Sequence, residues 1–253
     1  MSWDPDVYMK FANERTRPAI ELLARVPLEA PSRVIDLGCG PGNSTAILAA
    51  RWPHAEIEGL ESSPDMLTKA RASGIRANWI ESDIESWCPE KRYDLVFSNA
   101  TLHWIPNHRV LLPRLMNCVA EGGALAFQVP RNFDAPSHVL MREVANNGPW
   151  AAKHANARQV NVLEPDAYYD ILVALTKSLD IWETKYLQVL EGEDPVLVWV
   201  SGTGLRPFVQ PLDASERQVF TAEYRKRLRE AYPPRASGKT LFPFKRLFVV
   251  AKR

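Results

Sequence analysis

Apolar residues recur along the first 130 residues in two alternating patterns. Short β-rich runs alternate with stretches whose apolar residues have helical spacing. Asn43 or Ser44 is the expected cap of a helix over 43–52, and Ser63-Pro64 opens another helix. This alternation predicts parallel strands joined by right-handed crossovers, with helices covering both faces of the sheet. The β-rich runs span residues 33–37, 55–61, 76–81, 93–99 and 123–129.

After residue 129 the pattern changes to mostly helical spacing. A strand is expected at 178–190, helices at 194–203 and 213–231, and a last strand at 243–253. We therefore predict an α/β fold with a doubly wound, mostly parallel, seven-stranded sheet, helices on both faces and a helical cap inserted after strand five. The chain would be a single domain (1–253), with a ligand-binding core at 30–130, a cap with the sixth strand at 131–242 and a final strand at 243–253.

Composition excludes several classes of protein. The 253 residues carry 31 Lys+Arg and 30 Asp+Glu, a net charge of +1, which argues against a nucleic-acid or anionic-membrane binder because such proteins need a concentrated basic face. No apolar run approaches a membrane span, and the acidic start MSWDPDVYMKF is unlike a secretion signal. Cys39, Cys88 and Cys118 form no CxxC motif. We expect a cytoplasmic protein without a disulfide framework or a metal site.

The most informative segment is the glycine-rich run that follows the first strand. It reads Asp36-Leu37-Gly38-Cys39-Gly40-Pro41-Gly42-Asn43, with Asn43 where a dinucleotide fingerprint has its third glycine. Residues without Cβ allow a sharp turn and close approach of a ligand. The Asp36 carboxylate would repel a pyrophosphate but suits a cation, which points to S-adenosylmethionine, whose sulfonium and amino groups are positive. An ordinary glycine turn is the alternative, and a dinucleotide-dependent redox enzyme is a weaker one.

Two further acids follow the next strands. Glu61, followed by Ser62, ends the second strand and could accept hydrogen bonds from ribose hydroxyls. Asp83 follows the third strand, where it could receive an adenine amino group while Ile84 packs against the ring. Either acid alone could be a solvated surface charge. Their position behind the glycine loop favours a binding role.

These segments resemble class I S-adenosylmethionine-dependent methyltransferases over residues 30–130. The resemblance is carried by DLGCGPG (36–42), Glu61, SDI (82–84) and YDLVFSNATLHW (93–104). It implies that Asp36, Gly38 and Gly40 line the cofactor site, that Glu61 holds the ribose and that Asp83 holds the adenine. The turn at Asn99, Ala100 and Leu102 would line the methyl region. An amino-terminal helix often covers the cofactor in this fold, so Arg15 could hold the cofactor carboxylate.

A closer resemblance runs the length of the chain. It is similar to a family of methyltransferases that esterify a carboxylate of trans-aconitate, a small polycarboxylic acid. Residues 146–166 depart from that family, which leaves the acceptor preference open. The turn after the fourth strand lacks the Asn/Asp-Pro-Pro-aromatic motif of many base methylators. The matching segments are YMKFANERTRPAIELLARVPLE (8–29), NATLHWIPNH (99–108), HVLMREVA (138–145), AYYDIL (167–172), WVSGTGLRPF (199–208) and RLFVVAKR (246–253).

A carboxylate acceptor needs no chemical activation by the protein. With a pKa near ~4 it is already ionised at neutral pH, so no general base is expected. Catalysis would rest on positioning the acceptor and excluding water, and arginine forks would hold the carboxylates that do not react. A different small acceptor, with a base such as His103, and a cofactor-binding protein without turnover both remain open.

Five residues are candidates for the acceptor site. Arg206 and Arg131 are the candidate arginines, although Arg206 could instead form a surface ion pair. Trp104 would form an apolar wall. Tyr168 and Tyr169 could donate their hydroxyls to the acceptor, or could be aromatic residues of the core.

Overall fold

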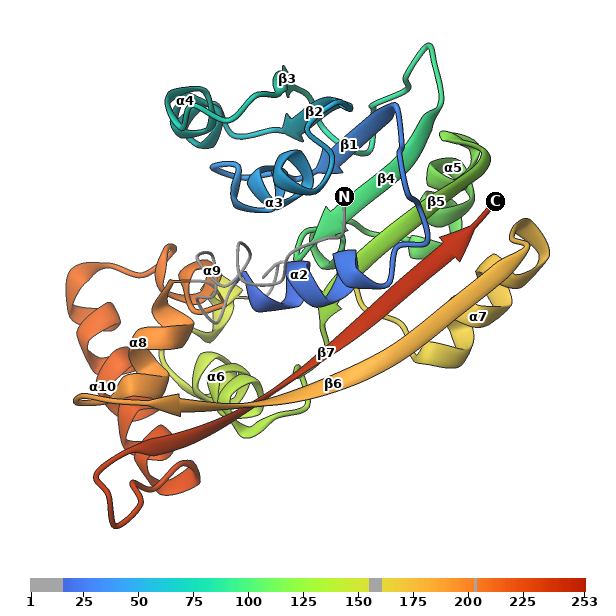
Figure 1. Cartoon of the computed structure of the whole chain (residues 1–253). Helices are drawn as coiled ribbons and strands as arrows, with labels where there is room; N and C mark the ends of the chain where they lie inside the picture. Colours follow the sequence, from blue (N-terminus) through green and yellow to red (C-terminus); the bar gives the residue numbers. More distant parts are fainter. Residues whose placement is uncertain (1–15, 155–160, 203) are drawn as a thin grey trace. The chain divides into compact units, whose positions relative to one another are not determined.

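The computed structural model describes residues 16–154, 161–202 and 204–253. Its strands form one seven-stranded sheet in the order β3-β2-β1-β4-β5-β7-β6. The first five strands pair in parallel, whereas β7 runs opposite to β5 (Figure 1). The strands are β1 (Arg33–Leu37), β2 (Glu56–Glu61), β3 (Asn78–Glu81), β4 (Tyr93–Asn99), β5 (Val119–Pro130), β6 (Ser178–Leu190) and β7 (Thr240–Lys252).

The strand order creates a switch point at the middle of the sheet. β1 pairs with both β2 and β4, so that Asp36 lies between Gly59 on one side and Phe97 on the other. From β1 the chain proceeds outward to β2 and β3 and then returns to β4 on the other side. In open α/β sheets, ligands bind beyond the carboxyl ends of the strands at such a point. The glycine loop after β1 lies at this position.

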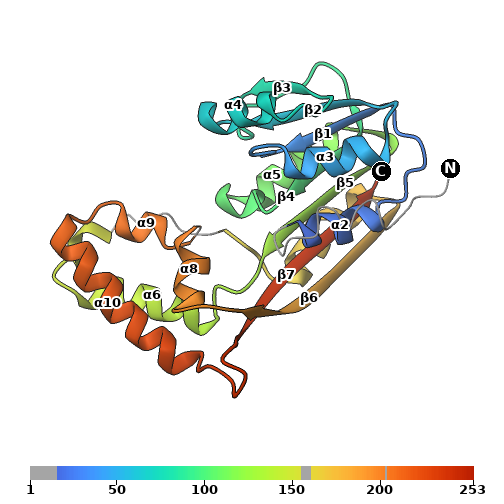
Figure 2. The ribbon, with the colours of Figure 1, turned by 60° about the vertical axis from the view of Figure 1, so that its left-hand side comes forward.

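Helices cover both faces of the sheet. α2 and α3 lie together on one face, and α5 lies on the opposite face (Figure 2). α7 packs against α5. Short 3-10 turns at Leu102–Trp104, Ala151–His154 and Val173–Leu175 complete the described helical segments. The helices are α2 (Arg17–Ala24), α3 (Asn43–Arg51), α4 (Pro64–Ala72), α5 (His108–Asn117), α6 (Pro136–Asn147), α7 (Pro165–Leu172), α8 (Pro195–Ser201), α9 (Arg206–Val209) and α10 (Ala214–Ala231).

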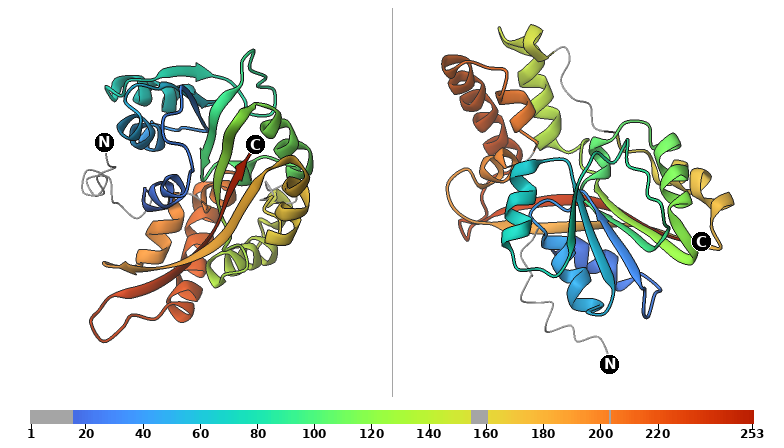
Figure 3. Two further views of the ribbon diagram at one scale, coloured as in Figure 1. Left: turned by 45° about the vertical axis from the view of Figure 1, so that its right-hand side comes forward. Right: turned by 90° about the horizontal axis from the view of Figure 1, so that it is seen from above.

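The chain forms two compact units. Of the described residues, unit 1 comprises 16–129, 161–184 and 246–253, and unit 2 comprises 130–154, 185–202 and 204–245. In unit 1 the face of the sheet that carries α5 and α7 buries a large apolar cluster around Val96, Leu112 and Phe127. In unit 2, α6 and α10 lie side by side (Figure 3) and bury a second cluster around Phe220 and Phe242. Each unit therefore has its own hydrophobic core.

The expected fold class is confirmed, and the element bounds agree closely. The strands predicted at 33–37, 93–99 and 178–190 have those bounds, because alternating and continuous apolar runs mark strands that pack on a core. One prediction is wrong: neither Asn43 nor Ser44 caps α3, because the cap is Gly42 and no side chain bonds there. No helix in the described part of the chain is long and apolar enough to cross a membrane.

Candidate functional site

The glycine loop between β1 and α3 has a backbone suited to glycine. Gly38, Gly40 and Gly42 have φ values of +70°, +55° and +98°, a region that residues with a Cβ rarely enter. A Cβ on Gly38 would lie 2.1 Å from Cγ2 of Thr101, whereas a Cβ on Gly40 would meet nothing within 4 Å. The loop is thus packed against the protein at Gly38 and open at Gly40.

Neighbouring strands hold this loop in place. The N–H groups of Gly38 and Cys39 donate to the Leu60 carbonyl of β2 at 2.7 and 3.0 Å. The hydroxyl of Thr101, which follows β4, donates to the Gly38 carbonyl at 3.0 Å. Sequence reasoning assigned no role to Thr101. Its role depends on β4 lying beside β1, and no local motif around residue 101 signals that contact.

Glu61 at the end of β2 connects the glycine loop to the turn that follows β2. One carboxylate oxygen accepts from the Gly40 N–H at 3.1 Å, and the other accepts from Ser62 and Ser63 at 2.9 and 3.0 Å. A carboxylate has about four lone-pair sites, so capacity remains for a ligand hydroxyl. Glu61 and Ser62 therefore lie beside the loop, and the expectation that this position holds the ribose stays a prediction.

Asp36 is a fully buried carboxylate beneath the loop. Its Oδ2 accepts hydrogen bonds from the hydroxyls of Ser44 and Thr45 in the first turn of α3, at 2.6 and 2.7 Å. Burial raises the pKa of Asp36 to about 6, although these two hydrogen bonds lower it, and the charge of Glu61 adds to the rise. The hydrogen bonds to Ser44 and Thr45 explain why the first turn of α3 carries hydroxyl side chains.

In strands β1 and β4, two buried oxygens have no hydrogen-bond partner among the described residues. They are Oδ1 of Asp36 and Oδ1 of Asn99. Ile35, Leu37 and Val96 pack in the main cluster of unit 1, so strand alternation places Asp36 and Asn99 together on the other face of the sheet. Buried acceptors without donors are costly in an apolar setting. They suit a cationic ligand, as S-adenosylmethionine is, and the residues present therefore fit this cofactor.

Asp83 and Ile84 differ in exposure. The Asp83 carboxylate is exposed and accepts from the Glu85 N–H at 2.7 Å. Ile84 is only 5% exposed and belongs to the core cluster, so little of its side chain is available to a ligand. Arg114 of α5 holds this turn by donating to the carbonyls of Ile84 and Trp87 at 2.5 and 2.6 Å. Sequence reasoning missed Arg114 because its partners are backbone groups distant in sequence.

Among the acceptor candidates in unit 1, Trp104 and Tyr169 are accessible but Tyr168 is not. Trp104 is half-buried, with its ring centroid 4.5 Å from that of His103, and Tyr169 is 52% exposed. Tyr168 is completely buried, and its hydroxyl bonds to His108 at 2.7 Å and accepts from the Leu163 N–H at 3.2 Å. This geometry favours a core role for Tyr168 over the expected hydroxyl donor. Leu102 is likewise fully buried in the core.

The remaining candidates lie in unit 2 or outside the described residues. Arg131 follows β5 and is half-buried, and its N–H donates to the Lys245 carbonyl at 2.9 Å. Arg206 begins α9 and is exposed, and it forms no ion pair with any residue that the structure describes. That observation does not support the surface ion pair considered for Arg206. Arg15 lies outside the described residues.

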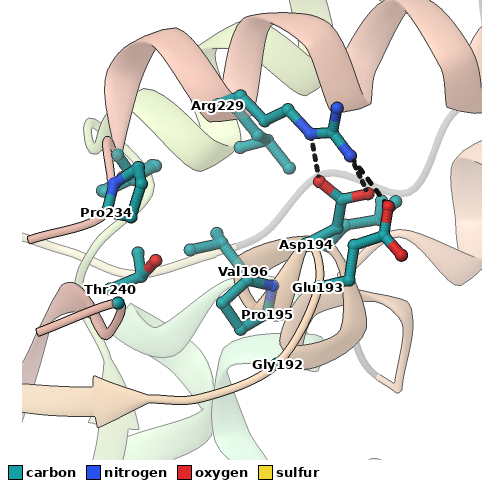
Figure 4. Close-up of a pocket in the computed structure, with 12 residues that line it drawn as sticks. Gly192, Glu193, Asp194, Pro195, Val196, Arg229, Pro234 and Thr240 are labelled. Carbon is teal, nitrogen blue, oxygen red and sulfur yellow. Dashed lines mark hydrogen bonds and ion pairs between the residues drawn. The ribbon is translucent and has the colours of Figure 1, made fainter.

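Unit 2 also contains a pocket of about 210 Å³ at the end of the β6–β7 strand pair (Figure 4). At its rim the Arg229 guanidinium contacts both oxygens of Asp194, at 2.5 and 2.9 Å. No predicted site residue in the described part of the chain lines this pocket. Its apolar walls come from Pro195, Val196, Leu197, Leu228, Tyr232 and Pro234.

The sheet order and the glycine loop with its two acids define a class of enzyme. Residues 10–174 match the family described as Methyltransferase domain, and the strand order and helices are those of a class I methyltransferase-like α/β fold. A solved structure of phosphoethanolamine N-methyltransferase 2 from Haemonchus contortus, in complex with phosphomonomethylethanolamine and S-adenosylhomocysteine, has a TM-score of 0.57 at 13% identity. The match covers 97% of this chain and 56% of that one, and it shows the shared fold.

Relatives with a higher sequence identity indicate which family within this class the chain belongs to. A protein from Azoarcus sp. (strain BH72) named trans-aconitate 2-methyltransferase is 48% identical over 253 residues, which cover 100% of this chain and 99% of the relative. A protein of the same name from Methylobacterium nodulans is 52% identical over 256 residues, covering 99% and 98%. The chain belongs to the trans-aconitate 2-methyltransferase family.

Proposed function

We propose that this protein transfers a methyl group from S-adenosylmethionine to a carboxylate of trans-aconitate or a closely related small polycarboxylic acid. The observation that carries the proposal is identity near 50% over the full length of relatives with that name. The match includes unit 2, where the cap lies in sequence, and is not confined to the cofactor-binding segments. Such coverage supports a shared acceptor as well as a shared cofactor, because the core alone serves many substrates.

The residues around the glycine loop would hold the cofactor. Asp36 and Asn99 offer acceptor oxygens to its cationic groups, Gly38 allows the sharp turn of the loop, Gly40 lets the cofactor approach the backbone, and Glu61 accepts from its ribose. Ser62 would line the same turn, Asp83 would meet the adenine with only the small exposed part of Ile84 beside it, and Arg15 would pair with the cofactor carboxylate. When bound, S-adenosylmethionine supplies an electrophilic methyl group on a sulfonium.

The protein itself would act mainly by positioning the acceptor. A carboxylate is ionised well below neutral pH (pKa ~4), so no side chain needs to remove a proton. Arg131 and Arg206 would bind the carboxylates that do not react, Trp104 would exclude water, and Tyr169 could donate its hydroxyl. Holding the nucleophile in line with the methyl group is worth several kcal/mol of barrier, of order ~7–11 in favourable cases. We do not retain Tyr168 in this set, because its hydroxyl is enclosed in the core.

The test is a product assay. Purified protein is incubated with methyl-labelled S-adenosylmethionine and a panel containing trans-aconitate, cis-aconitate, citrate and tricarballylate. We expect a base-labile methyl ester, formed fastest with trans-aconitate. Absence of an ester from every polycarboxylate, with cofactor binding intact, would reject the proposed acceptor class. Binding without turnover on any extract would instead favour a cofactor-dependent sensor.

A further inference from the structure

A buried polar cluster occupies the carboxyl end of β5 in unit 1. Gln128 is fully buried in β5, Arg246 of β7 is 6% exposed, and the Arg246 Nη1 donates to the Gln128 Oε1 at 3.1 Å. Gln128 is also the strand-register partner of Asn99 at the end of β4. Polar side chains of this kind are expensive to bury unless their groups are satisfied.

Arg246 fixes which way the Gln128 amide points. A guanidinium has only donors, so the carboxamide oxygen must face Arg246 and the amide nitrogen must point away from it. That nitrogen, Nε2, has no hydrogen-bond partner among the described residues. The cluster therefore presents an oriented, buried N–H donor that no described residue uses.

The position of this donor relates it to the proposed reaction. Leu125, Phe127 and Val129 of β5 and Leu247 of β7 pack in the main cluster. Strand alternation therefore sends Gln128 and Arg246 to the opposite face of the sheet, which also carries Asp36 and Asn99. Neighbouring strands lie about 4.8 Å apart, so the Asn99 Oδ1, which accepts hydrogen bonds, and the Gln128 Nε2, which donates them, belong to adjacent residues of the sheet. The oxygen suits a cationic group and the amide nitrogen suits an anionic one.

We propose that the Nε2 amide of Gln128 hydrogen-bonds a carboxylate oxygen of the acceptor, and that Arg246 is the positioning residue that orients this amide. The inference rests on the proposed function and adds a specificity-determining residue that sequence reasoning did not identify. It explains why a strand that is otherwise apolar from Ala124 to Val129 carries one carboxamide. It also explains why the amide nitrogen has no partner among the residues that the structure describes.

The sharpest variant is Gln128→Glu. It keeps an oxygen for Arg246, which retains this buried contact, but replaces the amide donor with an anionic acceptor that repels a carboxylate. We expect the affinity for trans-aconitate, measured by calorimetry with saturating S-adenosylhomocysteine, to fall at least about tenfold, the usual loss for a hydrogen bond to a charged group. The affinity for S-adenosylhomocysteine itself should stay within about twofold. Gln218→Glu, on the exposed side of α10, is the matched control with the same change of charge.

A second pair of variants tests the orienting role of Arg246. Arg246→Met removes the donor that fixes the amide, so acceptor affinity should fall and KM should rise with little change in the affinity for S-adenosylhomocysteine. Arg246→Lys retains a donor and should recover part of the loss. Gln128→Met removes both polar atoms without adding charge, and it gives the same prediction should the Glu variant fold poorly. Melting temperatures identify any variant that is unfolded.

Several outcomes would overturn the assignment. Unchanged trans-aconitate affinity in a folded Gln128→Glu or Gln128→Met variant would show that Gln128 does not touch the acceptor. A loss of S-adenosylhomocysteine affinity would move Gln128 to the cofactor site. Failure of the proposed function is separate, because the wild type would then neither bind nor methylate any polycarboxylate.

Discussion

Thr101 occupies the space that a side chain at Gly38 would need. The Thr101 hydroxyl donates to the Gly38 carbonyl at 3.0 Å, and its Cγ2 lies 2.1 Å from the position of a Cβ on residue 38. The turn after β4 thus fits directly against the glycine loop after β1. These two turns belong to the two strands that flank the switch point of the sheet.

Gly38→Ala should destabilise the protein by about 2–5 kcal/mol. The left-handed backbone at φ +70° costs a residue with a Cβ about 1–2 kcal/mol, and the overlap with Thr101 adds roughly 1–3 more. Gly74→Ala is the control, because Gly74 has φ +73° but nothing within 4 Å of its Cβ. Chemical denaturation of both variants checks this, and equal losses would contradict the steric role of Thr101.

Glu61→Ala should weaken cofactor binding by about 1.5–3 kcal/mol, or ten- to a hundredfold, the range for hydrogen bonds to a charged group. The variant loses the proposed ribose contact together with the hydrogen bonds that order Gly40, Ser62 and Ser63. Calorimetry with S-adenosylhomocysteine measures the effect, and Glu61→Gln, which keeps one acceptor oxygen, should lose less. An unchanged dissociation constant in the Ala variant would remove Glu61 from the site.

Asp36 should make the protein less stable as the pH rises through the range from about 4 to 6. Burial raises its pKa from 3.8 to about 6 in the folded state, so the folded protein keeps a proton that the unfolded chain releases. The stabilisation is complete below the unfolded pKa and is lost as the pH approaches the folded one, by up to ~3 kcal/mol. Comparing unfolding free energies of wild type and Asp36→Asn at pH 4, 5, 6 and 7 isolates this contribution. Asp65→Asn, exposed on α4, is the control; a difference between wild type and Asp36→Asn that does not change with pH would be the contrary result.

The rate at saturating cofactor should change little from pH 9 down to about 6. A carboxylate acceptor stays ionised over this range, so no protonation step gates the reaction. Saturating cofactor matters because protonation of Asp36 near pH 6 weakens the proposed attraction for a cation. A steep fall near pH ~6.5 would implicate a histidine base, with the buried His103 beside Trp104 as the first candidate, and would favour a different acceptor.

Arg206→Ala should raise the KM for the acceptor about tenfold while cofactor affinity holds, since a charged hydrogen bond is worth about 1.5–3 kcal/mol. Arg206 is exposed at the start of α9 and forms no ion pair within the described residues, so the substitution should cost little stability. Arg235→Ala, another exposed arginine of unit 2, is the control. A drop in cofactor affinity would show that the assignment to the acceptor is wrong.

Local patterns were enough to predict much of this structure. The β-rich runs ended in turns at the residues where β1, β2 and β4 end, because strand length and the turn residues are encoded over a few neighbouring positions. Asp36, Gly40 and Glu61 could likewise be chosen as candidate cofactor residues, since they occur at characteristic distances from strand ends. The structure adds their contacts within the protein, and their role towards the cofactor stays a prediction.

Local sequence patterns could not predict contacts between strands that are far apart in the sequence. Gln128 and Arg246 are 118 positions apart, and they meet because β7 inserts between β5 and β6. Tyr168 and Tyr169 are neighbours in sequence, yet helix α7 turns the first into the core and the second outward. Similarly, Gly42 replaces the expected cap of α3 because Ser44 turns towards Asp36 instead.

The position of β7 between β5 and β6 has a consequence for how the protein folds during synthesis. Unit 1 needs residues 246–253, since β7 lies between β5 and β6 in the sheet, whereas residues 130–154, 185–202 and 204–245 of unit 2 are made earlier. During translation, when domains generally fold as they emerge, the native partner of the β5 edge is missing until β7 has been made. A chain truncated before β7 would leave the β5 edge unpaired, and an exposed strand edge is a template for pairing with another chain.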